Sequence, residues 1–342
     1  MRGKLMADTT INNPAHQKPH DQMAAYLAKD LDAVNTLIRT RMASEHAPRI
    51  PEVTAHLVEA GGKRLRPMLT LAAAHMCGYK GLYHIHLAAT VEFIHTATLL
   101  HDDVVDESAQ RRGRPTANLL WDNQSSVLVG DYLFSRSFQL MVETGSLQVL
   151  DILANASATI AEGEVLQLTA ARDLKTDEGV YLQIVRGKTA ALFSAATKVG
   201  GVIADADDDV VKALFEYGDA LGVAFQIVDD LLDYQGQSSA TGKHVGDDFR
   251  ERKLTLPVIK AIAKADTEGH AFWKRTIEKG QQKDGDLDMA LALLHKHNAL
   301  ADTRDEAIAW AAKSAVALSA LPEHPVKQML IDLADYVVER IN

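Results

Sequence analysis

The chain has little cysteine, little proline and no long apolar run, and each shortage excludes a class of protein. Its single cysteine, Cys77, has no second cysteine for an internal disulfide, so a reducing, cytoplasmic compartment is expected. Charged residues interrupt every apolar stretch before it reaches the roughly 20 residues of a membrane span. Residues 1–20 lack the apolar core of a secretion signal and are expected to form a polar, flexible tail.

Basic residues are also fewer than acidic ones. There are 36 Lys and Arg against 46 Asp and Glu, which gives a net charge of −10. This balance argues against general nucleic-acid binding, although a local basic pocket is still compatible with it. Hydrophobic residues make up 47% of the chain and charged residues 24%, as in ordinary globular proteins.

With only 9 prolines in 342 residues, long segments show apolar residues at helical spacing, and alternating patterns are scarce. The expected helices span residues 21–45, 52–60, 65–77, 82–106, 125–143, 147–171, 177–199, 207–234, 257–265, 286–298, 302–319 and 325–340. No Pro/Ser-rich linker divides the chain, and the polar stretches 235–256 and 278–286 are expected to be surface loops. The sequence therefore predicts an all-α, single-domain helical bundle over residues 21–342.

Two aspartate clusters of the form D-D-x-x-D end two of the most apolar helices. The first supplies Asp102, Asp103 and Asp106, and the second supplies Asp229, Asp230 and Asp233. Positions i and i+4 share a helix face, so the like charges repel each other, and they also oppose the helix dipole at a C-terminus. A hard divalent cation removes both conflicts, and carboxylate oxygens suit Mg²⁺. The alternative is two solvated helix ends that happen to be acidic.

Cationic and polar residues near these clusters could hold anionic groups. GGKRLRP places Lys63 and Arg66 after a Gly-Gly break, and Arg111 and Arg112 follow the first cluster. Lys188 and Thr189 interrupt an apolar helix. His95 lies two turns before Asp102, and Gln226 lies three residues before Asp229. Taken singly, each has a plain alternative: a surface lysine, a solvated loop arginine pair, a core histidine or a surface glutamine.

The motifs together resemble the trans-isoprenyl diphosphate synthase family. GGKRLRP, LLHDDVVDE with RRG, GEVLQL, GKT, and FQIVDDLLD followed by GK and KLTLP occur in the family's order, mostly within residues 50–260. HTATLLHDDVVDES and RRGRPTANLLWDN are most similar to the long-chain synthases that make quinone side chains. The resemblance implies an isoprenoid-synthase-type bundle around a central apolar cavity. It also implies a reaction in which an allylic diphosphate ionises and isopentenyl diphosphate attacks the carbocation.

The resemblance also implies roles for the motif residues. The six aspartates would bind Mg²⁺, three ions once substrate is present, and the catalytic set is Asp102, Asp103, Asp106, Lys188, Asp229 and Asp230. Arg111, Lys188 and Lys243 would contact the allylic diphosphate, which would be farnesyl or geranylgeranyl diphosphate. Isopentenyl diphosphate would be bound by Lys63, Arg66, His95 and Arg112. Thr189 and Gln226 would line the reacting centre, and the released diphosphate would accept the proton.

Product length is expected to depend on the helix before Asp102. The face below the aspartates carries Thr98 and Ala97, then Ile94, then Val91 and Leu87. Its first turn has only small side chains, so nothing there blocks a growing tail, and we expect a C40–C50 product with decaprenyl favoured. The alternative is that Ala97 and Thr98 are simply helix-packing residues, with a geranylgeranyl or shorter product.

Two alternative functions remain to be weighed against prenyl transfer. A terpene cyclase shares the fold but usually replaces the second aspartate cluster, and an inert subunit of a hetero-oligomeric synthase usually loses one cluster. A homodimer is expected from the family, and the sequence leaves a peripheral membrane contact open.

The sequence departs from the family pattern at two places. His244 follows Lys243, where many members have proline, and the C-terminus has Arg340 as its only base.

Overall fold

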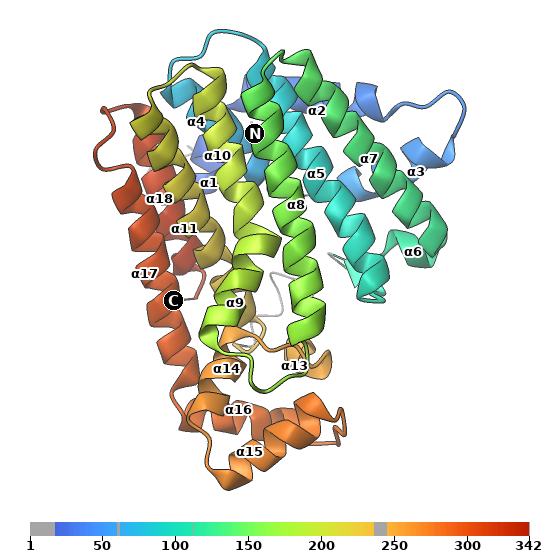
Figure 1. Ribbon diagram of the computed structural model, residues 1–342, viewed down its shortest axis with the longest axis vertical. Helices are drawn as coiled ribbons and strands as arrows, with labels where there is room; N and C mark the ends of the chain where they lie inside the picture. The colour runs from blue at the N-terminus through green and yellow to red at the C-terminus, as the bar shows by residue number, and fades with distance from the viewer. Residues whose placement is uncertain (1–17, 60–61, 112, 236–244, 342) are drawn as a thin grey trace, which may run out of the picture.

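The computed structural model describes residues 18–59, 62–111, 113–235 and 245–341, and these are almost entirely helical (Figure 1). The first half contains α1 (Pro19–Tyr26), α2 (Ala28–Met42), α3 (Arg49–Glu59), α4 (Leu65–Met76), α5 (Tyr83–Val105), α6 (Ala117–Leu120), α7 (Asn123–Glu143) and α8 (Leu147–Ala170). The second half contains α9 (Glu178–Val185), α10 (Ala191–Ile203), α11 (Asp208–Leu232), α13 (Asp247–Arg250), α14 (Leu256–Ala263), α15 (Thr267–Trp273), α16 (Asp286–Lys296), α17 (Ala299–Ala317) and α18 (Pro325–Glu339). Two π-helical turns, η2 (Arg186–Ala190) and η3 (Lys274–Glu278), and an antiparallel hairpin of β1 (Gln110–Arg111) and β2 (Arg114–Pro115) complete the described elements.

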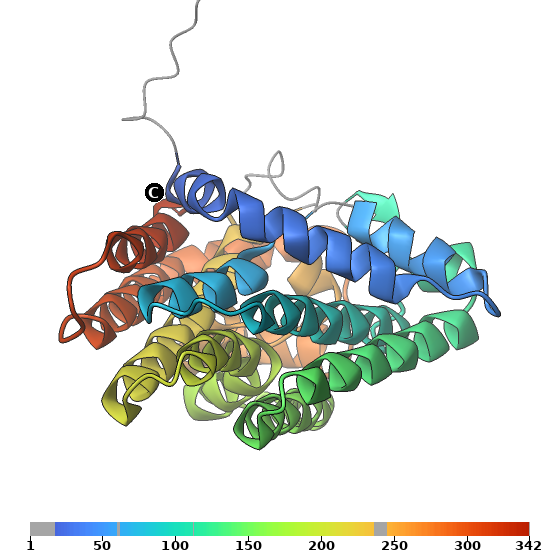
Figure 2. The ribbon, with the colours of Figure 1, turned by 90° about the horizontal axis from the view of Figure 1, so that it is seen from above.

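The long helices lie side by side around α10, which contacts α4, α5, α8 and α11. In Figure 1, α17 and α18 lie along one side of this bundle and α7 along the other. Figure 2 shows α1 and α2 running across the bundle, with the start of α1 beside the end of α18. The first and last described helices therefore meet on one face, where α1 contacts both α18 and α4.

A second, smaller core lies at the end of the bundle formed by α13 to α16. It contains the buried side chains of Phe249, Trp273 and Leu294, among others. Leu254 and Leu300 pack against both this core and the main one, so the two are joined by shared apolar contacts. No helix among the described residues is both long and apolar enough to span a bilayer.

The all-α prediction is confirmed, and most expected helices lie within a few residues of their predicted ends. The single helix expected over 21–45 is instead two helices, divided at Leu27. The stretch expected to be a loop over 235–256 contains α13. The tail expected over 1–20 stays a prediction, because residues 1–17 lie outside the described ones and α1 begins at Pro19.

The helix formed by α15 and η3 was not expected from the sequence. Gly269 weakens the helical pattern there, but the Asp266 side chain accepts a hydrogen bond from its backbone N–H and caps the helix. Phe272, Trp273 and Ile277 then bury their side chains in the smaller core. Tertiary burial therefore outweighs the weak local propensity.

A close backbone contact positions the π-helical turn η2. Gly187 lies against Gly163 of α8, and a Cβ atom on Gly187 would lie 2.7 Å from the Gly163 Cα and 3.0 Å from the carbonyl oxygen of Thr159. Both neighbours are backbone atoms, so they have little freedom to move aside. The two glycines let α8 approach the turn that carries Lys188 and Thr189.

We predict that Gly187→Ala lowers the free energy of unfolding by about 1–3 kcal/mol, because the added methyl group overpacks this contact. Gly179→Ala at the start of α9 is the matched control, since its Cβ would meet only the Asp177 side chain, at 3.2 Å. Denaturant unfolding of both variants measures the difference. Equal stability of the two variants would show that the close approach is not required.

Candidate active site

Both aspartate clusters lie at the C-terminal ends of their helices. α5 ends at Val105 with Asp106 as its C-cap, and α11 ends at Leu232 with Asp233 as its C-cap. Within each cluster the side chains differ in burial. Asp103, Asp230 and Asp233 are buried, Asp102 and Asp229 are half-buried, and Asp106 is exposed.

Asp103 is fully buried because the β1–β2 hairpin folds back onto α5. The Arg111 guanidinium donates from Nε and from a terminal nitrogen to Asp103 Oδ1, at 2.9 and 2.8 Å. The pair lies eight residues apart in the sequence, and Asn118 donates to the Asp103 carbonyl oxygen. This charge-assisted, forked contact fixes the loop after the first cluster against the helix end.

Asp102 faces the π-helical turn. Burial raises the pKa of Asp102 to about 7; nearby Glu164 and Asp106 add to this rise, and Lys188 opposes it. Lys188 itself donates to Glu164 Oε2 at 2.9 Å. The predicted convergence of Lys188 with the first cluster is therefore present in the structure, and Glu164 of α8 is its ion-pair partner.

Asp230 anchors a hydrogen-bonded chain between three helical segments. It accepts from the Tyr181 hydroxyl at 2.7 Å and from Gln226 Nε2 at 2.8 Å. Gln226 Oε1 in turn accepts from the Thr189 hydroxyl at 2.8 Å. Burial raises the pKa of Asp230 to about 7, and Asp248 adds to the rise while the two hydrogen bonds oppose it.

Lys253 brings a positive charge beside the first cluster. Its Nζ lies 3.9 Å from Asp106 Oδ2 and 2.6 Å from Glu251 Oε2. Burial disfavours its charge, but Asp248, Glu251 and Asp106 outweigh this and raise the pKa of Lys253 to about 12. The backbone N–H of Asp248 also donates to Asp233 Oδ2 at 3.1 Å. Cations and amide groups thus surround the carboxylates on several sides.

A second basic region lies beside the clusters. An Arg66 terminal nitrogen lies 3.1 Å from His95 Nε2, and the Arg66 guanidinium stacks over the Phe193 ring at 4.6 Å. Lys63 lies over the Tyr336 ring of α18 at 5.8 Å. Burial lowers the pKa of Lys63, as does the charge of Arg340, and Asp229 is among the acidic groups that oppose this. The C-terminal helix therefore reaches the neighbourhood of the predicted isopentenyl site.

Arg112 and Lys243 lie outside the described residues, so their predicted contacts are untested. Sequence reasoning missed Glu164, Tyr181, Asp248 and Lys253. The motifs GEVLQL and KLTLP contain Glu164 and Lys253 and offered a signal for both. Tyr181 and Asp248 offered none, because an aromatic residue in an apolar helix and an acidic residue in a polar stretch are both common.

The α5 face below Asp102 is lined as expected. Ala97, Ile94, Val91 and Leu87 are fully buried, and Thr98 is half-buried with its hydroxyl donating to the His95 carbonyl oxygen. Phe93 is also buried, but it lies nine residues before Asp102, which is half a turn away around the helix. The first turn below the aspartates therefore carries no aromatic side chain on this face.

The donor set fits a hard divalent cation. The aspartates offer oxygen ligands from two helix ends, and burial of Asp102 and Asp230 disfavours their charged forms in the absence of a further cation. A divalent ion bound by the clusters would supply the missing positive charge.

Comparison with known proteins gives concordant matches. The family model described as polyprenyl synthetase matches residues 47–294. The octaprenyl diphosphate synthase of Escherichia coli is 43% identical over 92% of this chain and 96% of that protein. The crystal structure of a decaprenyl diphosphate synthase from Rhodobacter capsulatus is 72% identical, with a TM-score of 0.92 over 95% of this chain and 100% of that chain.

A third match bears on ligands. The polyprenyl synthase of Caulobacter crescentus, solved in complex with calcium and isoprenyl diphosphate, is 48% identical, with a TM-score of 0.89 over 93% of this chain and 97% of that one. These matches cover both aspartate clusters and nearly all described helices, and they favour prenyl transfer over the terpene-cyclase alternative. The chain belongs to the polyprenyl synthetase family.

Proposed function

We propose that this prenyltransferase condenses isopentenyl diphosphate repeatedly onto farnesyl or geranylgeranyl diphosphate and releases a C40–C50 polyprenyl diphosphate for quinone side chains. The observation that carries the proposal is the buried α5 face below Asp102, which has small side chains where a tail would begin. The similarity to an octaprenyl and a decaprenyl synthase supports the same product range.

The proposed cofactor is Mg²⁺, held by Asp102, Asp103 and Asp106 and by Asp229, Asp230 and Asp233. When bound, it would supply positive charge to the diphosphate leaving group. The chain's own cations, Arg111 and Lys188, lie beside the first cluster and add to that charge. Their side chains are held in place by Asp103 and Glu164.

Isopentenyl diphosphate is assigned to the basic region formed by Lys63, Arg66 and His95. In the contact between Arg66 and His95 the guanidinium donates to the imidazole Nε2, and the Phe193 ring holds the guanidinium plane. Because Lys63 lies under α18, the C-terminal helix would help to exclude water from this region. Water must be kept out because it would quench a carbocation.

Thr189 and Gln226 are assigned to the reacting centre. The Thr189 hydroxyl donates a hydrogen bond to Gln226 Oε1, which leaves the hydroxyl lone pairs as electron-rich partners for an allylic cation. Gln226 is fixed in this orientation because its amide nitrogen donates to Asp230. The departing diphosphate would accept the proton lost at each condensation.

We also propose that the enzyme is a homodimer that associates through α7. Val127, Leu128, Phe138 and Val142 are exposed on this helix, and helical geometry places them within about 100° of one another. In both ribbon views α7 lies at the edge of the bundle (Figures 1 and 2). An apolar stripe of this kind is typical of an association surface.

With Asp102→Asn, we expect turnover to fall by about 10²- to 10³-fold, because a carboxylate that binds the cation at the leaving group is lost. The melting temperature measured without metal should be unchanged or higher, since the repulsion of Asp102 by Asp106 and Glu164 is relieved. Asp305→Asn, on the exposed side of α17, is the control and should leave both quantities unchanged. Near-normal turnover of Asp102→Asn would contradict the assignment.

Product length is tested with purified protein, Mg²⁺, farnesyl diphosphate and labelled isopentenyl diphosphate. The wild-type product ladder should end at C40–C50. Ala97→Tyr should stop it at about C15–C20, that is, at the unextended farnesyl primer or after one addition, because the ring fills the buried face below Asp102. Leu82→Tyr, at an exposed position before α5, is the control and should keep the wild-type ladder. Wild-type protein that makes no elongated product would overturn the proposed function. An unchanged ladder for an active Ala97→Tyr variant would exclude length control by this face.

The dimer is tested with the double variant Leu128→Glu/Phe138→Glu. Charges in the apolar stripe should convert a dimer to a monomer, as measured by gel filtration with light scattering. Val316→Glu, at an exposed apolar position on α17, should elute as the wild type does. A wild-type protein of monomer mass would contradict the proposal.

A further inference from the structure

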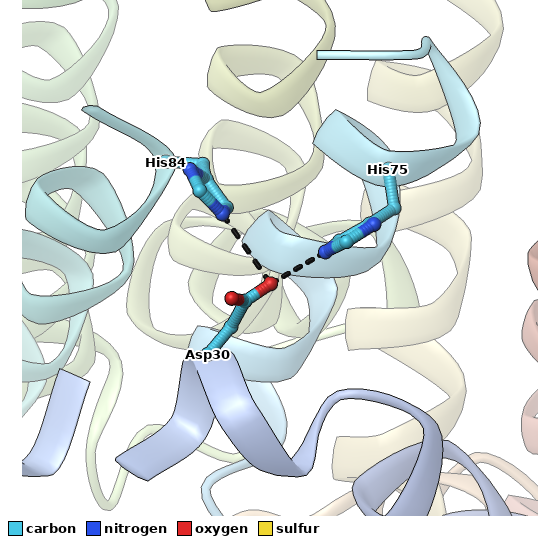
Figure 3. Close-up of side chains that lie close together, drawn as sticks. All are labelled: Asp30, His75 and His84. Atoms are coloured by element: carbon cyan, nitrogen blue, oxygen red, sulfur yellow. Dashed lines mark hydrogen bonds and ion pairs between the residues drawn. The ribbon is translucent and has the colours of Figure 1, made fainter. Parts of the chain in front are cut away.

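Three side chains converge at a point that the reaction does not use. His75 in the last turn of α4 and His84 in the first turn of α5 both direct Nε2 at the same carboxylate oxygen of Asp30, on α2 (Figure 3). The two N···O distances to Asp30 Oδ2 are 2.5 and 3.3 Å. The imidazole rings lie edge to face, with their centroids 5.8 Å apart.

This cluster is separate from the aspartate clusters. His84 precedes Asp102 by 18 residues on the same helix, which corresponds to about 27 Å along the helix axis. The His84 side chain is 11% exposed, Asp30 is 20% exposed and His75 is 35% exposed. The group is thus largely enclosed but can be reached from solvent on the His75 side.

The chemistry of the group matches a borderline-soft divalent ion. Two imidazole nitrogens and one carboxylate oxygen are common protein ligands for zinc, and a water molecule can take the fourth tetrahedral position. Among the described residues these three form the one such group whose ligand atoms all lie within 4.8 Å of one another. Small side-chain rotations would let them surround one ion.

We propose that Asp30, His75 and His84 bind one zinc ion that fastens α2 to the turn between α4 and α5. On binding, each imidazole would carry its proton on Nδ1 and ligate through Nε2. The buried Nδ1 of His84 has no hydrogen-bond partner in the structure, so the affinity should be lower than that of a site with a complete outer shell.

The ion would stabilise the arm formed by α1 and α2. His20 of α1 contacts the Lys63 carbonyl oxygen through Nε2 at 2.7 Å, and α1 also contacts α18. Fixing α2 would therefore hold this arm over the segment that precedes α4. The role is structural and does not depend on the proposed prenyl-transfer chemistry.

The test is a zinc titration of the metal-stripped full-length protein against a chromophoric chelator, with millimolar Mg²⁺ present to compete at the aspartate clusters. The wild type should bind one zinc ion more than His84→Gln, whose affinity at this site should fall by more than about 10-fold. His86→Gln is the matched control, because His86 lies two residues away on α5 and contacts Glu143 at 3.2 Å. This control should keep the additional ion.

Thermal unfolding provides a second readout. Zinc should raise the melting temperature of the wild type and of His86→Gln by a few degrees, and should have no such effect on His84→Gln or Asp30→Asn. The number of zinc ions bound by the wild-type protein tests the proposal by itself, even where a variant folds poorly. Equal zinc binding by the wild type and His84→Gln, with no shift in melting temperature, would overturn the proposal. The three side chains would then only join the helices through hydrogen bonds.

Discussion

The constraint on which the rest of the structure depends is the mutual repulsion of several carboxylates at the ends of two apolar helices. Each cluster adds like charges to a helix terminus that is already electronegative, and burial makes their repulsion stronger. Cations and hydrogen-bond donors offset this repulsion. Arg111 and Gln226 come from nearby in the sequence, whereas Lys188, Lys253 and Tyr181 come from distant elements. Burial still disfavours the charged forms of Asp102 and Asp230, and carboxylate oxygens gathered in this way suit a divalent cation.

The cations can reach the carboxylates only because helices approach each other closely. Gly163 and Gly187 bring the backbone of α8 against the π-helical turn, which places Lys188 beside Glu164. Within the same turn, Thr189 faces Gln226 of α11. A π-helical turn widens the helix locally and changes the direction of the side chains on it, a feature that often coincides with functional sites. Packing and chemistry are thus coupled at one short segment.

Apolar side chains are arranged differently on two helices of the bundle. Along α5, the face below Asp102 is buried and offers small side chains near the aspartates and larger aliphatic ones further down. Along α7, apolar side chains instead face solvent at the edge of the bundle. The first arrangement suits a growing hydrocarbon chain, and the second suits association with another subunit.

The sequence by itself determined the helices and the two aspartate clusters, because both follow from local geometry. Apolar periodicity places a helix within a few residues, and a D-D-x-x-D motif puts its first and last aspartates on one helix face wherever it occurs. The family motifs likewise pointed to Arg66, His95, Lys188 and Gln226, which the structure places in contact with other members of the site or with their neighbours. The helix formed by α15 and η3 was missed because its stability comes from burial of Trp273 and Ile277 rather than from local propensity.

Only the tertiary structure decided which partner each charged group has. Asp230 meets Tyr181 across 49 residues of sequence, and Lys188 meets Glu164 across 24. Likewise, Asp30 meets His75 and His84 from a different helix. Which groups meet depends on how the helices cross. Burial and the neighbouring charges then shift the pKa of each group, and no local sequence pattern encodes either effect. Local spacing fixes the relative positions of residues within one helix, whereas contacts between helices are fixed only when the whole core packs.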